Sequence, residues 1–204
     1  MPTTLLPPAP RLVLGSTSPY RRELLQRLRL PFDVVAPAVD ETARPGETPA
    51  RLAARLALDK AREVASRHAG AVVIGADQVA DLQGQALGKP GHHAAALAQL
   101  QAMRGQWVVF HTAVAVLRAD RGFEQVQVAT VRVRFRDLSD TDIERYLALE
   151  QPYDCAGSAK CETLGIALLD VIESDDPTAL VGLPLIRTCR LLREAGLDVL
   201  ASAP

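Results

Sequence analysis

The order of the apolar segments is the feature that most limits what this chain can fold into. In the first half, short apolar runs at 11–15, 32–39 and 71–80 alternate with segments of helical spacing. In the middle, two long apolar runs at 107–117 and 124–135 follow one another directly. Alternating strands and helices indicate parallel pairing, whereas consecutive strands indicate antiparallel neighbours. We therefore expect an α/β protein with a mixed sheet rather than a purely parallel one.

The helices are predicted from their start signals. Three starts carry a hydroxyl N-cap followed by proline or by an acidic first turn: Ser18-Pro19, Thr48-Pro49 and Ser139. Both patterns favour the first helical turn. The second of these helices is expected to reach about residue 67 and the third residue 150. Further helices are expected over 94–103 and 180–195, the latter interrupted near its start by Pro184, and a last strand over 166–172. The stretch 82–91 is predicted to be turn-rich.

Length and composition allow one large domain with a full core or two small lobes. The chain has 204 residues, 48% of them hydrophobic, and a formal net charge of -1. This is enough for a full core, and the near-zero charge predicts no general attraction to nucleic acid or membranes. We expect residues 11–200 to form a single domain and residues 1–10 to be disordered or loosely packed.

The start of the chain and the cysteines suggest the compartment. The first residues, MPTTLLPPAPR, lack the basic start and long apolar region of a signal peptide. No apolar run approaches the roughly 20 residues of a membrane span. Three cysteines without CxxC spacing are typical of reduced thiols. We therefore expect a cytoplasmic protein with no membrane partner and no nucleic-acid partner.

The junction GSTSPYRR, residues 15–22, predicts an anion site. It places small residues, free N–H groups and a helix N-terminus directly after a strand, where the helix dipole favours negative charge. Arg21 and Arg22 in the first helical turn oppose that dipole, so a phosphate is the natural compensating group. The alternative is an ordinary capped helix with surface arginines. The pattern is not a P-loop, because GxxxxGK[ST] is absent.

Two acidic positions are candidates for chemistry. Asp40 and Glu41 open a polar loop and could bind a hard cation, although exposed acid pairs are commonly just solvated. Asp77 follows the apolar run VVIGA, and we expect it at the end of that strand. A carboxylate leaving a buried strand is costly unless it is paired or bound to a metal. Strand ends are also where ligands gather in α/β proteins.

Lysine is scarce, since only three of the 23 basic residues are lysines. A lysine in such a background can be present for its compact ammonium, which the planar guanidinium of arginine cannot copy. Lys60 continues an apolar row of its helix, where the alternative is a side chain that reaches solvent at the edge of that row. Lys89 lies in the turn GKPG, where the alternative is a solvated turn lysine. The third is Lys160.

Several motifs together resemble the Maf family of nucleotide pyrophosphatases. They are, in order, STSPYRRELL, VDET, GADQV, GKP, HTAVAV and AGSAKCETLGI. The resemblance runs from about residue 12 to residue 192. It implies an inosine-triphosphatase-like α/β fold, in which a mixed twisted sheet with flanking helices forms a deep cleft between two lobes. It also implies a homodimer, a divalent metal (Mg, Mn or Co) and cleavage between the α- and β-phosphates of a nucleoside triphosphate.

The resemblance assigns roles to individual positions. Asp77 matches the proton acceptor, and Glu41 with Asp77 matches the acids associated with the metal. The residues around the phosphates would be Ser16, Arg21, Arg22, Lys60 and Lys89. Those that select the base would be Tyr20, Gln78 and Glu162. A triphosphate needs several cations, and a nearby carboxylate can deprotonate the attacking water, so the chemistry of these residue types agrees.

The residues that select the base resemble the branch acting on 7-methylguanosine triphosphate. N7-methylated guanine is positively charged, so an aromatic face attracts it, and a carboxylate accepts hydrogen bonds from guanine N–H groups. The chain departs from this branch with Tyr20 for tryptophan, Cys161 for serine and Thr163 for glycine. The resemblance thus implies release of 7-methylguanosine monophosphate and pyrophosphate, a way to clear modified nucleotides. The alternatives are uridine, thymidine or cytidine triphosphate as substrate, or a nucleotide-sensing regulator of septum formation in cell division.

Overall fold

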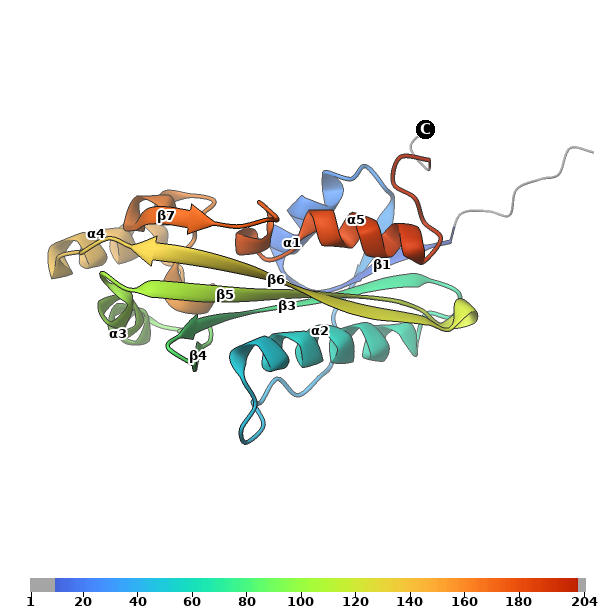
Figure 1. The fold of residues 1–204 in the computed structure, drawn as a ribbon, viewed down its shortest axis with the longest axis horizontal. Coiled ribbons are helices and arrows are strands. Elements are labelled where there is room, and N and C mark those ends of the chain that lie inside the picture. Colours follow the sequence, from blue (N-terminus) through green and yellow to red (C-terminus); the bar gives the residue numbers. More distant parts are fainter. Residues whose placement is uncertain (1–9, 202–204) are drawn as a thin grey trace, which may run out of the picture.

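The protein is described by a computed structural model that covers residues 10–201 (Figure 1). Seven strands alternate with five α-helices in the expected α/β pattern. The strands are β1 (Leu12–Gly15), β2 (Phe32–Val35), β3 (Val72–Leu82), β4 (Gln85–Leu87), β5 (Trp107–Arg118), β6 (Phe123–Phe135) and β7 (Leu169–Glu173). The helices are α1 (Pro19–Gln26), α2 (Pro49–Ala65), α3 (His93–Met103), α4 (Asp140–Glu150) and α5 (Leu185–Glu194). Of the segment 1–10 expected to be loosely packed, all but Pro10 lies outside the described residues.

All seven strands belong to one mixed sheet, as predicted. The strand order is β2-β1-β3-β5-β6-β7, and β4 pairs with the far end of β3. β1 is parallel to both β2 and β3, whereas the remaining pairs are antiparallel. The parallel part corresponds to the alternating first half of the sequence and the antiparallel part to the consecutive apolar runs.

Helices cover both faces of the sheet and divide the molecule into two lobes (Figure 1). In the first lobe, α2 packs beneath β3 and β5, and α1 and α5 cover the opposite face of the sheet. An apolar cluster is buried between the sheet and the helices on each face. The second lobe lies at the other end of the long strands, where α3 and α4 enclose a third cluster with β5 and β6. The long antiparallel strands run through both lobes and connect them rigidly.

The helix starts follow the sequence signals. Ser18 and Thr48 each accept a hydrogen bond from a backbone N–H of the first turn, with proline at the next position. Ser139 forms a full capping box with Asp142. None of the helices within 10–201 is long and apolar enough to cross a membrane. These starts are local interactions, which is why short sequence patterns were sufficient to place them.

Two strand predictions are wrong in extent. β3 does not end at Asp77 but continues to Leu82, because β5 pairs with it from Val73 through Asp81. The second strand stops at Val35 instead of residue 39. Pro37 lies just beyond that end, and proline has no N–H to donate to a sheet.

Three other boundaries also differ. The stretch 82–91 contains the expected turn at 83–84 and a loop at 88–91, but between them lies the unpredicted strand β4, which returns along β3 as a hairpin. The last strand begins at Leu169 rather than residue 166, after a short 3-10 helix over 164–168. The final helix begins at Leu185, because Pro184 occupies its N-cap and a proline is not tolerated in the helix interior.

Candidate functional site

A cavity of about 530 Å³ lies where the two lobes meet. The first lobe contributes the β1–α1 junction, the loop after β2 and one side of α2. The second contributes the segments 86–89 and 154–162, and residues 180–182 close a further side. Of the ten predicted site residues, nine line this cavity: Ser16, Tyr20, Arg21, Glu41, Lys60, Asp77, Gln78, Lys89 and Glu162. The structure therefore brings together residues separated by up to 146 positions in the sequence.

The cavity forms at a gap in the sheet. β1 ends at Gly15, which is level with Gly75 of β3, and β4 rejoins the same edge only at Ala80. Across the described part of the chain, no strand pairs with that edge of β3 at 76–79. Asp77 and Gln78 lie in this gap. Their side chains point to opposite faces of β3, but because no neighbouring strand covers the edge between them, both reach the cavity. The strand end that creates the site therefore belongs to β1, not to β3.

Lys60 connects two carboxylates at the floor of the cavity. Its Nζ lies 2.6 Å from Oδ1 of Asp77 and 2.7 Å from Oε1 of Glu41. The side chains of Lys60 and Asp77 are only 7% and 11% exposed, whereas that of Glu41 is 59% exposed. Asp77 is thus held in place by a buried ion pair, while Glu41 reaches in from a solvent-facing loop. Lys60 does not extend to solvent at the edge of its apolar row.

The charge of Glu41 is maintained by its neighbours. Partial burial acts against its ionised form, but the hydrogen bond from Lys60 and the charges of Lys60, Lys89 and Arg21 outweigh that effect. The pKa of Glu41 consequently lies below its usual value. At neutral pH this end of the cavity presents ionised carboxylate oxygen among three cationic side chains.

A close approach of α2 to β3 brings Lys60 to Asp77. A Cβ added at Gly75 would lie 2.2 Å from the carbonyl oxygen of Ala57 and 2.6 Å from the backbone nitrogen of Ala61. Only glycine fits at this contact, where the helix backbone lies directly against the strand. Asp77 lies two residues after Gly75 and therefore on the same face of β3, and Lys60 lies beside Ala61 on α2. The close packing at Gly75 therefore sets the distance between Lys60 and Asp77.

Arg21 faces the cavity from the first turn of α1. Its Nε donates to the carbonyl oxygen of Gly182 at 2.9 Å, and its Nη1 lies 3.4 Å from Oγ of Ser16. Burial lowers the pKa of Arg21, and the carboxylates of Asp77 and Glu41 oppose that change. A guanidinium stays charged in proteins, so Arg21 is a half-buried cation that forms no ion pair with a carboxylate of residues 10–201. It is well placed to receive an anion.

The remaining predicted cations differ in position. Lys89 is exposed and lines the cavity from the loop after β4. Arg22 does not reach the cavity, since it is exposed and borders a separate shallow hollow with Phe32 and Asp33. Neighbouring positions on an α-helix point about 100° apart, and in α1 Tyr20 and Arg21 face the cavity whereas Arg22 faces the other hollow. Of the two arginines expected around the phosphates, the structure therefore places Arg21 at the cavity and Arg22 outside it.

The other end of the cavity carries the residues expected to select the base. Gln78 is fixed by its Nε2, which donates to Oγ1 of Thr112 at 3.0 Å and to the carbonyl oxygens of Ala179 and Leu180. Its amide oxygen is thereby available to a ligand. Burial raises the pKa of Tyr20 to about 12, so its hydroxyl remains a hydrogen-bond donor. Loss of surrounding water also raises the pKa of Glu162.

Two groups of residues near the site were not assigned a role from the sequence. Asp154 accepts a hydrogen bond from the hydroxyl of Tyr20 at 3.3 Å, and Lys160 lies over the ring of Tyr20. Lys160 is one of only three lysines, so its scarcity was a usable signal. The sequence carried no comparable signal for Asp154, because a lone aspartate in a loop is usually solvated.

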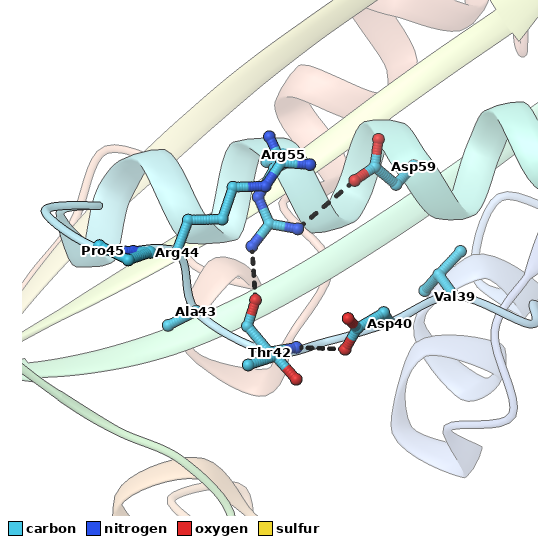
Figure 2. A pocket seen from close by; sticks show the side chains of 8 residues that line it. All are labelled: Val39, Asp40, Thr42, Ala43, Arg44, Pro45, Arg55 and Asp59. Carbon is cyan, nitrogen blue, oxygen red and sulfur yellow. Dashed lines mark hydrogen bonds and ion pairs between the residues drawn. The ribbon is translucent and has the colours of Figure 1, made fainter.

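The second group ties down the loop that carries Glu41. Arg55 of α2 makes two contacts with the carboxylate of Glu47, at 2.6 and 2.8 Å, and donates to the carbonyl oxygen of Thr42 at 3.0 Å. Figure 2 shows Arg55 reaching from the helix to Thr42 and to Asp59 beside a small pocket under the loop. Arg55 therefore fixes both ends of the segment that follows Glu41.

Glu41 and Asp77 are the two cavity residues that could bind a metal ion. Among residues 10–201, no group of three or more His, Cys, Asp or Glu side chains is placed to hold one. Glu41 and Asp77 nevertheless converge, since each touches the same ammonium. Mg²⁺ is commonly bound by one or two carboxylates together with substrate phosphates. The donor set therefore fits a hard divalent cation that arrives with a phosphorylated ligand.

Comparison with known proteins gives consistent matches over nearly the whole chain. A family model described as Maf-like protein matches residues 11–195. The 7-methyl-GTP pyrophosphatase of Albidiferax ferrireducens is 66% identical over 192 residues, covering 94% of this chain and 96% of the relative. The protein of the same name from Polaromonas sp. is 67% identical, covering 98% and 91%. That from Burkholderia thailandensis is 61% identical, covering 92% and 88%.

Proposed function

The chain belongs to the Maf family, and we propose that it hydrolyses 7-methylguanosine triphosphate to 7-methylguanosine monophosphate and pyrophosphate. Its relatives at 61–67% identity carry the name 7-methyl-GTP pyrophosphatase. In the cell, the reaction would remove modified nucleotides. The proposal depends above all on one observation, which is that three cationic side chains gather at one end of the cavity while an aromatic ring and two further carboxylates lie at the other.

The phosphate end of the cavity suits a triphosphate. Arg21, Lys60 and Lys89 provide three cations there, and Ser16 adds a hydroxyl. The base end suits a cationic purine, because it carries the aromatic ring of Tyr20 and the carboxylates of Glu162 and Asp154. An aromatic face and nearby carboxylates attract positive charge. The arrangement therefore matches a ligand that is anionic at one end and cationic at the other.

Asp77 is the proposed proton acceptor. Its Oδ1 is engaged by Lys60, so we assign the proton of the attacking water to Oδ2. The water oxygen bonds to the α-phosphorus, and the bond from that phosphorus to the oxygen bridging the α- and β-phosphates breaks. The electron pair leaves with pyrophosphate, whose developing charge Arg21, Lys60 and Lys89 stabilise. Asp77 then releases its proton to solvent.

A divalent cation (Mg, Mn or Co) is part of the proposal, with Glu41 and Asp77 as its protein ligands. When bound with the triphosphate, it would supply additional positive charge next to the departing phosphates. Glu41 is the more exposed of the two acids and can turn from Lys60 toward the cation. Dialysis against a chelator should abolish turnover, and adding back each metal separately identifies the preferred one.

A panel of nucleotides tests the proposed substrate. Purified protein is incubated with 7-methylguanosine, guanosine, uridine, thymidine and cytidine triphosphates, and the products are identified. We expect the fastest turnover with 7-methylguanosine triphosphate and release of pyrophosphate. Release of orthophosphate would overturn the bond assignment, and faster turnover of a pyrimidine nucleotide would overturn the substrate. Binding without turnover of any nucleotide would favour a sensing role instead.

We also propose a homodimer formed through the segment around β7. Within the described chain, β7 is the last strand of the sheet, and Leu164, Ile166, Val171 and Ile172 are exposed on and beside it. A second copy would cover these apolar side chains and the strand edge. Light scattering should give a molar mass twice that of one chain. The substitution Ile166→Asp should reduce the measured mass to that of a single chain.

A cytoplasmic location is proposed on two grounds. Cys155, Cys161 and Cys189 are all free thiols, a state typical of a reducing compartment. Nucleoside triphosphates, the proposed substrates, are also made and used there. Fractionation of cells that produce the protein at its natural level tests this location.

A further inference from the structure

Lys160 lies against the ring of Tyr20 without being part of the cavity wall. Its Nζ is 5.3 Å from the ring centroid. Tyr20 lines the cavity, whereas Lys160 is not among the residues that do. At this distance an ammonium is attracted to the electron-rich face of an aromatic ring. Lys160 thus contacts the ring of Tyr20 without itself lining the cavity.

The position of Lys160 is fixed by the second lobe. Its Nζ pairs with Oε1 of Glu150 at 3.1 Å, and both side chains are largely buried. The other oxygen of Glu150 accepts the N–H of Leu164 at 3.1 Å. The backbone N–H of Lys160 donates to the hydroxyl of Tyr146 at 3.0 Å. These three contacts hold Lys160 and Glu150 at the end of α4.

Tyr20 belongs to the first lobe but is held by the second. Its ring comes from the first turn of α1, yet its hydroxyl donates to Asp154 and its face meets Lys160. The contacts with Tyr20 and then Glu150 raise the pKa of Lys160, so the ammonium is fully charged at neutral pH. The hydroxyl of Tyr20 is held by Asp154 and its ring by Lys160. These two contacts together fix the orientation of the ring relative to the cavity.

We propose that Lys160, braced by Glu150, is a positioning residue that orients the ring of Tyr20 for stacking on the substrate base. The inference rests on the proposed function for the identity of that base. A ring already held in its binding orientation loses less conformational entropy when the ligand arrives. Glu150 also balances the charge of Lys160, so the ammonium against the ring does not repel a cationic base.

The first test is steady-state kinetics of Lys160→Met, which removes the ammonium and keeps a long side chain. The KM for 7-methylguanosine triphosphate should rise about three- to ten-fold, in keeping with the loss of one cation–π contact. The kcat should be nearly unchanged, because the phosphate end is untouched. Lys160→Arg should restore the KM, since arginine keeps the charge over the ring. Arg145→Met, which removes an exposed cation from α4, is the matched control.

A double-mutant cycle decides whether Lys160 acts through Tyr20. In a Tyr20→Ala background, Lys160→Met should have no further effect on KM. Equal effects in both backgrounds, or a fall in kcat with unchanged KM, would overturn the inference. If Lys160→Met does not fold, Glu150→Gln replaces it in the same cycle, since it removes the brace and keeps the lysine.

The cycle also separates this inference from the proposed function. If the wild-type protein turns over a pyrimidine triphosphate and not 7-methylguanosine triphosphate, the substrate assignment fails. The same cycle is then measured with that nucleotide, because every base has a face that can stack on Tyr20. If the wild type uses 7-methylguanosine triphosphate and the two substitutions are additive, only the role of Lys160 fails.

Discussion

Lys60 shares one ammonium between Asp77 and Glu41, and that contact determines how each acid can be used. Removing one partner of a buried ion pair leaves an uncompensated charge, at a cost of about 3–5 kcal/mol. Lys60 and Asp77 form such a pair. Glu41, by contrast, can leave the contact at little cost because it is exposed. The structure thus keeps a fixed acid and an adjustable one around a single cation.

Asp77→Asn is the sharpest substitution at this scale. An amide cannot take the proton of the attacking water, so kcat should fall by at least about a hundred-fold. The fold should survive, because the amide oxygen still accepts from Lys60 and Glu41 remains to balance its charge. Turnover and thermal unfolding are measured on the same preparation. Near-normal turnover in a folded variant would refute the assignment.

Glu47 predicts a pH dependence of stability. Its hydrogen bond from Arg55, and then that from the N–H of Arg44, lower its pKa from 4.5 to about 2. Because the folded-state pKa is the lower one, Glu47 stabilises the fold above pH 4.5, and this contribution is lost as pH falls toward 2. In urea unfolding, the difference between wild type and Glu47→Gln should therefore be largest near neutral pH and shrink below pH 4.5.

A matched control for that titration is Glu194→Gln, which removes an exposed acid at the end of α5. Its effect on stability should be small at every pH, because no such contact with arginine is lost. A gap between wild type and Glu47→Gln that stayed constant down to pH 2 would contradict the role given to Arg55.

At the scale of elements, the site depends on how α2 packs against β3. Helix and strand meet at Gly75, where no side chain fits. On either side of this contact, apolar residues of both elements form one buried cluster that includes Val64, Val73 and Leu56. The packing of these two elements therefore fixes the ion pair that lies just beyond it.

Gly75→Ala tests this packing. Its Cβ would meet backbone atoms that cannot rotate away, so we expect a loss of about 1–3 kcal/mol in the free energy of unfolding. Turnover should fall as well, because α2 must move and Lys60 with it. Gly88→Ala is the control for stability, since an added Cβ there meets nothing within 4 Å. Equal stability of the two variants would mean that the contact is not tight.

At the scale of the whole molecule, the ligand space is a joint product of two lobes. The long strands β3, β5 and β6 hold the lobes at a fixed separation, and the gap in the sheet opens between them. Residues from both lobes line the cavity. A ligand that spans it binds only the folded protein and should stabilise it in proportion to its occupancy.

Pyrophosphate, the proposed product, provides a test without turnover. At a concentration one hundred times its Kd, it should stabilise the fold by about 2.7 kcal/mol, seen as a rise in Tm. Lys89→Met should reduce this rise by weakening binding. It should leave the Tm of the free protein unchanged, because Lys89 is exposed in a loop. The parallel control, Arg22→Met, should keep the full rise, since Arg22 lies outside the cavity.

Features that depend on neighbouring residues could be predicted from the sequence. The hydroxyl–proline pairs at Ser18 and Thr48 start helices because cap and first turn are local contacts. The alternation of strands and helices, followed by consecutive strands, specified a mixed sheet. The spaced motifs identified nine residues that share one cavity, although their distances in the chain gave no geometry.

The orientation and contacts of those residues, in contrast, depend on how distant segments pack together. Asp77 lies in the middle of a strand and is accessible because another strand, β1, stops early. Arg21 faces the ligand space and Arg22 does not, because the phase of α1 is set by what it packs against. Lys160 meets Tyr20 across the lobes. Each of these facts depends on contacts between distant segments, whose energies are not encoded in any short stretch of sequence.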